Sequence, residues 1–179
     1  TKLGERMARL PLHPRLSRVV LEGEKNDCIA STILCAVGLE EGLLRGDTRD
    51  HSSTDFWRQL ELLRRDLSNQ ARRRQSSRPM LMMNQLAREL NVDSSACFDS
   101  VDEERTGSCL FKGFPDRVER KRVESDISPT RYSLVLDARE DPYQVRSKVT
   151  IQSSIDISEE LLLLGPEEFV RESTVVSWD

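Results

Sequence analysis

Residues Leu3–Val20 read LGERMARLPLHPRLSRVV, and this stretch sets the organisation that we expect for the whole chain. Leu3, Met7 and Leu10 recur at i, i+4 and i+7, the spacing of one face of an amphipathic helix. The sequence therefore predicts a short helix that ends near Leu10.

A stiff corner and a second helix are expected next. Pro11 and Pro14 cannot continue the first helix, because proline has no amide hydrogen and its ring clashes with the preceding turn. Pro14 suits the first position of a new helix, whose apolar stripe is Leu16, Val19 and Val20. Two helices joined across two prolines predict a fixed elbow.

These residues also carry a resemblance to a known family. Leu3–Val20 resembles the start of the helicase-associated region of DEAH/DExH-box helicases, in which a leucine-glycine pair, a methionine-alanine pair and an LP-x-x-PRL run recur. Phe114–Arg122, FPDRVERKR, narrows the resemblance to the bacterial HrpB-type ATP-dependent helicases. Weaker matches occur at Arg131-Tyr132 and at Val176–Asp179.

The resemblance implies an architecture. In that family the region follows two RecA-like ATPase domains and comprises the end of a winged helix, a ratchet-like helical bundle and an OB-fold. We therefore expect an α+β chain, with a helicase-associated elbow and helical bundle over residues 1–124 and a partial OB-like β-module over residues 125–179. ATP and Mg²⁺ would bind to motor domains outside this sequence, and we expect no cofactor in the chain itself.

Local patterns predict the elements. We expect Asn26 or Asp27 to cap a central buried helix that Gly38 ends. A long helix is predicted from Thr54-Asp55, another from Pro79, and a further one after a capping box at Ser100-x-x-Glu103. A short helix should restart at Phe114–Asp116 and carry the basic residues that follow.

The pattern of apolar and polar residues changes after Ser125. Tyr132, Leu134 and Leu136 alternate with Ser133 and Asp137, which is typical of a strand. Residues 145–151 and 155–157 predict further strands, whereas the pattern of Leu161–Leu164 fits a buried strand or a short helix. In the family, a glycine-containing turn follows Arg-Tyr-x-Leu. This chain has Leu136–Arg139 there, so we expect a different hairpin geometry.

The sequence lacks the motifs that ATP hydrolysis, metal binding and histidine-dependent catalysis require. No glycine begins the G-x-x-x-x-G-K-[ST] phosphate loop and there is no DEAH motif, so we expect no ATPase activity from the chain alone. The two histidines, His13 and His51, do not form a metal-binding or catalytic pattern. The cysteines show no CxxC spacing and are expected to be reduced core thiols: Cys28, Cys35, Cys97 and Cys109.

Location is inferred from what the sequence lacks. The longest apolar run, Cys28–Leu39, is too short to span a bilayer, and no signal peptide is recognisable. We therefore expect a cytoplasmic protein. The chain begins at Thr1 without an initiator methionine, which suggests a fragment of a longer protein.

Nucleic-acid contact is the leading functional hypothesis. The net charge of −4 does not indicate such a partner, but the basic residues are clustered. Arg117, Arg120 and Lys121 have i, i+3, i+4 spacing and would share one face of a helix, close to Arg131. We expect these four residues to contact the backbone of RNA or another single strand. The chain would line the strand channel and couple to the motor domains of its parent protein.

Other interpretations stay open. The basic cluster could be a solvated helix end that Glu119 and Glu124 partly neutralise. A helical platform for protein partners, without nucleic-acid binding, fits the acidic C-terminal half. A free-standing winged-helix transcription factor is the weaker third alternative, because no complete recognition-helix unit precedes the bundle.

Overall fold

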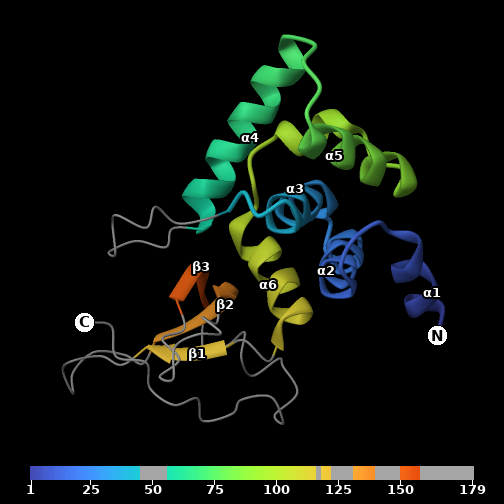
Figure 1. The fold of residues 1–179 in the computed structure, drawn as a ribbon. Coiled ribbons are helices and arrows are strands. Elements are labelled where there is room, and N and C mark those ends of the chain that lie inside the picture. The colour runs from blue at the N-terminus through green and yellow to red at the C-terminus, as the bar shows by residue number, and fades with distance from the viewer. Residues whose placement is uncertain (45–55, 116–117, 122–130, 140–149, 158–179) are drawn as a thin grey trace.

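The computed structural model describes residues 1–44, 56–115, 118–121, 131–139 and 150–157, and side-chain packing is described for the first two ranges. Within those two ranges the chain is helical, with no strand (Figure 1). The helices are α1 (Lys2–Arg9), α2 (Pro14–Lys25), α3 (Ile29–Glu40), α4 (Phe56–Arg72), α5 (Arg78–Glu89), the 3-10 helix η1 (Ser94–Phe98) and α6 (Glu103–Gly113).

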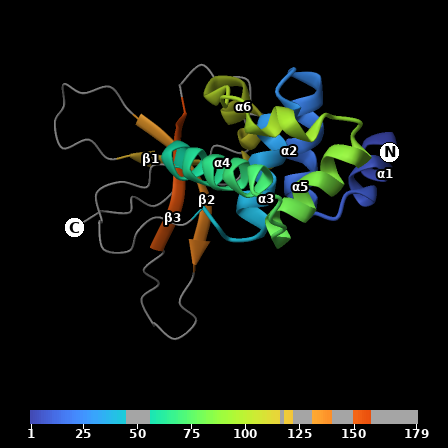
Figure 2. The same ribbon diagram turned by 90° about the horizontal axis from the view of Figure 1, so that it is seen from above.

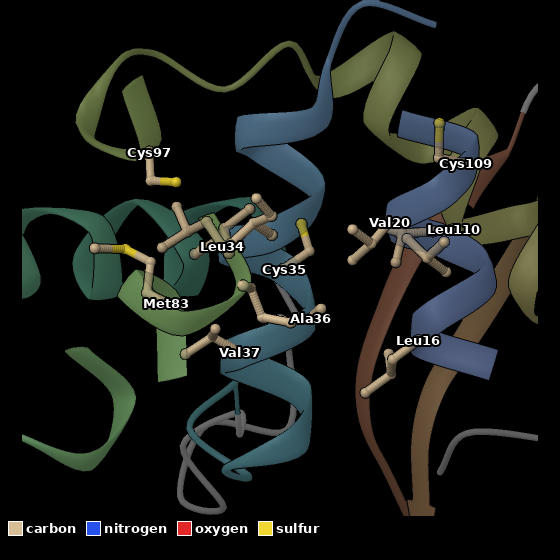
Figure 3. Packing of buried hydrophobic residues seen from close by; sticks show 14 of the residues in the cluster. Leu16, Val20, Leu34, Cys35, Ala36, Val37, Met83, Cys97, Cys109 and Leu110 are labelled. Carbon is tan, nitrogen blue, oxygen red and sulfur yellow. The ribbon is translucent and has the colours of Figure 1, made fainter. Parts of the chain in front are cut away.

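Helix α3 is the centre of the core, because it is apolar on nearly every side. Its middle turns are buried from Thr32 to Gly38. Figure 3 shows Leu34 and Val37 directed toward Met83 of α5, while Cys35 is directed toward Val20 of α2. A helix that is buried all round must be covered on several faces, and α2, α4, α5 and α6 provide this cover.

The helix boundaries correct three local predictions. Neither Asn26 nor Asp27 caps α3: the N-cap is Cys28, and the side chain of Asn26 instead donates to the Glu22 carbonyl at the end of α2, at 2.7 Å. The N-cap of α6 is Asp102, not Ser100. Asp102 accepts a hydrogen bond from the Arg105 amide at 3.0 Å, whereas Cys28 makes no side-chain capping bond.

Gly38 does not end α3, as its sequence position suggested. The helix continues to Glu40, and Gly42 takes the positive φ of 62°. A β-carbon on Gly38 would lie 2.7 Å from Leu44 Cγ and 2.9 Å from Leu63 Cδ2. This glycine is therefore a close-packing position against the next part of the chain, not a helix stop.

Three strands follow the helices and form an antiparallel sheet in the order β1-β2-β3. They are β1 (Val118–Lys121), β2 (Arg131–Arg139) and β3 (Thr150–Ile157). The β2–β3 register shifts around Asp137. The expected difference in hairpin geometry from the family stays a prediction. The sheet lies beside the bundle, where β3 approaches α4 (Figure 2).

The predicted fold class, α+β with an OB-like module, is wrong, because residues 1–44 and 56–115, where side-chain packing is described, form helices and no strand. An OB-fold is a five-stranded Greek-key barrel, whereas the described strands form an open meander of three. Alternating apolar residues set a strand's two faces but do not determine whether a sheet closes. The helical-bundle part of the prediction agrees with the structure. The division at residue 124 stays a prediction, and β1 and β2 pair across it.

Some expectations fall outside the described residues. They concern His51, Leu161–Leu164 and the closing segment Val176–Asp179. Among the helices that are described, none combines the length and the apolar character that crossing a bilayer requires. The cytoplasmic location stays a prediction.

Candidate nucleic-acid interface

The elbow predicted from the two prolines is confirmed. Leu10 ends α1 in an extended conformation, with φ −85° and ψ 133°, and its side chain is buried. Pro14 begins α2, and His13 caps it by accepting a hydrogen bond from the Arg15 amide at Nδ1, at 3.3 Å. The joint is set locally, because the prolines stop one helix and the next is capped within a few residues.

A contact with the core fixes the direction of the elbow. The His13 amide donates to Glu40 Oε2 at 3.0 Å, so the corner is tied to the C-terminal end of α3. Leu16 is buried on the inner side of α2, and Leu3 and Met7 pack against the same core from α1. These residues have the structural role that the sequence suggested for them.

The end of α6 packs closely on α2. A β-carbon on Gly113 would lie 3.0 Å from the Arg15 carbonyl oxygen and would collide with Val19. The Arg15 guanidinium lies over the ring of Phe114, 5.7 Å from its centroid, in a cation–π arrangement. The chain that leads from Phe114 into β1 therefore starts from a fixed point on the elbow's second helix.

The basic residues lie on a strand, not on the predicted helix. The short helix expected after Phe114 is wrong, because Val118–Lys121 forms β1. The i, i+3, i+4 argument for a shared helical face therefore does not apply. Glu, Arg and Lys favour a helix on local propensity, and pairing with β2 overrides that preference.

The sheet places three of the four predicted site residues on two paired strands, with Lys121 and Arg131 at one face and Arg120 at the other. Lys121 and Arg131 are direct partners across the β1–β2 ladder, and Arg120 pairs with Tyr132. We call Arg120, Lys121 and Arg131 the basic ladder. Arg117 lies outside the described residues. All four predicted site residues are basic, as contact with phosphate requires. Their role in binding stays a prediction.

A second basic cluster is separate from the ladder. Arg72, Arg73 and Arg74 are exposed at the C-terminal end of α4, the end directed away from the sheet in Figure 1. Basic residues there also suit the helix dipole. The two clusters therefore do not form one continuous surface.

The sequence analysis missed a buried carboxylate. Glu22 is only 3% exposed, and Arg18 and Lys25 each approach its Oε1 at 2.9 Å. Lys112 of α6 approaches Oε2 at 3.5 Å. Burial alone would raise the pKa of Glu22, but the hydrogen bond from Lys25 and the nearby cations lower it overall. The i, i+4 and i, i+3 spacings were visible in the sequence, whereas the Lys112 contact required the packing of α6 on α2.

Comparison with known proteins does not supply an identity. No family model and no curated protein matches the chain. In the part that the structure describes, no group of three or more histidine, cysteine or acidic residues could hold a metal ion. The expectations about ATP, Mg²⁺ and cofactors stay predictions.

Proposed function

We propose that this chain is the accessory region of an HrpB-type ATP-dependent helicase, and that its basic ladder contacts the backbone of RNA or another single strand. The ATPase motor domains would lie outside this sequence. The proposal does not need an OB-fold, because phosphate contact depends on clustered cations on a fixed support.

One observation carries this proposal: Arg15 and Phe114 are in contact. Arg15 belongs to the LP-x-x-PRL run and Phe114 opens FPDRVERKR, so each of the two sequence stretches behind the resemblance supplies one partner. Unrelated chance matches have no reason to meet across the fold. A shared contact is what two parts of one mechanical unit require.

The elbow and its contacts support a mechanical role. His13 is tied to α3 through Glu40, and Gly113 is packed against α2. Force applied to α1 or α2 would therefore pass to α6 and onward to β1 through packed elements. Such a connection suits a passive channel wall that moves with a motor.

Salt-dependent RNA binding tests the proposal. We would measure the fluorescence anisotropy of a labelled single-stranded RNA with the 179-residue chain, between about 50 and about 200 mM salt. The test variant is Arg120→Ala with Lys121→Ala. The matched control is Arg73→Ala with Arg74→Ala, which removes the same charge from the far end of α4.

We expect the test variant to weaken binding for all RNA sequences. Its slope of log affinity against log salt should fall by about 1 for each lost phosphate contact, while the control keeps most of its affinity. Equal losses in both variants would mean non-specific attraction and contradict the proposal. If the unmodified chain does not bind RNA at low salt, the protein-interaction platform is favoured.

A further inference from the structure

Two cysteines far apart in the sequence meet inside the bundle. Cys28 is the N-cap of α3, at the junction with α2, and Cys109 lies in α6. Their Sγ atoms are 3.7 Å apart, although 81 positions separate the residues. Both are free thiols in this structure. Sulfur atoms at this separation are in van der Waals contact, and they would have to approach by about 1.7 Å to reach the S–S bond length of about 2.0 Å.

The surroundings give the two thiols different roles. The hydrogen bond from Cys109 lowers the pKa of Cys28, while burial opposes this effect. The same bond and burial raise the pKa of Cys109. Asn26 Nδ2 also lies 3.7 Å from Cys109 Sγ, where it can donate to the sulfur. These shifts favour ionisation of Cys28 over that of Cys109.

The other two cysteines provide a contrast within the same core. Burial raises the pKa of Cys97 to about 12 and also raises the pKa of Cys35. Figure 3 shows Cys97 on the opposite side of α3 from Cys109, whereas Cys35 is directed toward Val20 of α2. Neither has a thiol partner among the described cysteines that matches the Cys28–Cys109 contact.

We propose that Cys28 and Cys109 are a redox modification site that closes reversibly into an intramolecular disulfide. The oxidant is a small disulfide such as oxidised glutathione. The Cys28 thiolate attacks one of its sulfurs, the S–S bond breaks, and one glutathione thiolate leaves. The Cys109 thiolate then attacks Cys28 Sγ and releases the second glutathione. The protein loses two electrons, and the two thiol protons end on the two glutathione molecules.

The disulfide would join α6 directly to the α2–α3 junction. Since α6 leads into β1, oxidation would restrict the movement of the sheet's attachment relative to the elbow. Cys28 is 6% exposed and Cys109 is 0% exposed, so the oxidant must wait for local opening of this region. Oxidation is therefore expected to be slow and to become faster in low concentrations of urea.

The experiment uses the 179-residue chain incubated with oxidised glutathione in low urea, followed by alkylation and mass spectrometry of a non-reduced digest. We expect one dominant cross-linked pair, Cys28 with Cys109, that dithiothreitol reverses. The urea midpoint of unfolding should rise after oxidation, because the cross-link closes a long loop in the unfolded chain.

Single substitutions locate the effect. Cys28→Ala and Cys109→Ala should each abolish the cross-link and the rise in midpoint, while Cys35→Ala and Cys97→Ala keep both. The disulfide pairing found by mass spectrometry in the unmodified chain tests the proposal even if a variant folds poorly. A cross-link through Cys35 or Cys97, a glutathione adduct on Cys28 that never closes, or four alkylated thiols after local opening would each overturn the proposal.

Discussion

Gly23 of α2 lies so close to Thr32 of α3 that a β-carbon on Gly23 would come within 2.7 Å of Thr32 Cγ2. Thr32 is fully buried, and its hydroxyl donates to the Ile29 carbonyl at 2.9 Å. A β-branched side chain held in this way cannot move aside. This close approach of α2 to α3 therefore depends on the absence of a β-carbon at position 23.

We predict that Gly23→Ala lowers the free energy of unfolding. Overpacking of a tight core costs about 1–3 kcal/mol, which exceeds the gain of about 1 kcal/mol that alanine gives over glycine in a helix. Urea denaturation followed by circular dichroism would measure the difference.

The matched control for this helix contact is Gly4→Ala on the exposed face of α1. A β-carbon there would lie 3.3 Å from Thr1 Oγ1, a contact that a surface side chain can relieve. We expect Gly4→Ala to be neutral or slightly stabilising. If Gly23→Ala proved as stable as this control, close packing of α2 on α3 would be disproved.

Glu22→Gln should destabilise the protein at neutral pH by about 1–3 kcal/mol, the range for hydrogen bonds to charged groups. The pKa of Glu22 is lower in the folded chain, so its ionised form stabilises the fold above the unfolded-state pKa of 4.5. That contribution is lost as pH falls below 4.5 and through the lowered pKa. The difference between wild type and variant should therefore shrink in acid, as urea titrations at several pH values would show.

The control for the buried carboxylate is Glu24→Gln. Glu24 pairs with Arg6 at 2.7 Å on the surface, where both side chains are more than 40% exposed. Exposed pairs contribute about 0–1 kcal/mol, so this variant should stay close to wild type. A Glu22→Gln difference that does not change with pH would refute the assigned role of the charge.

Glu61 should titrate far below an ordinary glutamate. The fork of Arg64 holds both of its carboxylate oxygens, at 2.6 and 2.7 Å. This hydrogen bonding, opposed by partial burial and aided by Arg65, lowers the pKa of Glu61 to about 2. Its stabilising contribution is therefore present above 4.5 and lost as pH falls toward 2. Carboxyl NMR titration would follow the group directly.

Arg64→Lys should raise the midpoint of the Glu61 titration, because an ammonium cannot reproduce the planar fork. Arg64 also donates to the Phe98 carbonyl, so the variant should loosen the contact between α4 and η1. Arg65→Lys is the control, since Arg65 is 68% exposed. A wild-type midpoint near 4.5 would rule out the bidentate pair.

Glu40→Gln and Glu40→Ala test how the elbow is tied to the core. Both remove the carboxylate that accepts from the His13 amide, but glutamine keeps a neutral acceptor. We expect faster hydrogen exchange of the His13 amide in Glu40→Ala and an intermediate rate in Glu40→Gln. Unchanged exchange in both would mean that the prolines alone fix the joint.

The sequence by itself determined the elements whose causes are local. The elbow follows from Pro11 and Pro14, since a missing amide hydrogen and a fixed φ act within a few residues. The apolar spacing of α4 was equally readable: Leu60 and Leu67 are fully or almost fully buried, as their helical period implied.

Only the tertiary structure decided what depends on a distant partner. FPDRVERKR was predicted as a helix but contains a strand, because its pairing with β2 overrides the local preference of Glu, Arg and Lys for a helix. The contact of Arg15 with Phe114 and that of Cys28 with Cys109 likewise depend on how packed elements are placed. The spacing of apolar residues reveals the period of a single helix or strand. Contacts between residues that are far apart in the sequence depend instead on how the helices and strands pack together.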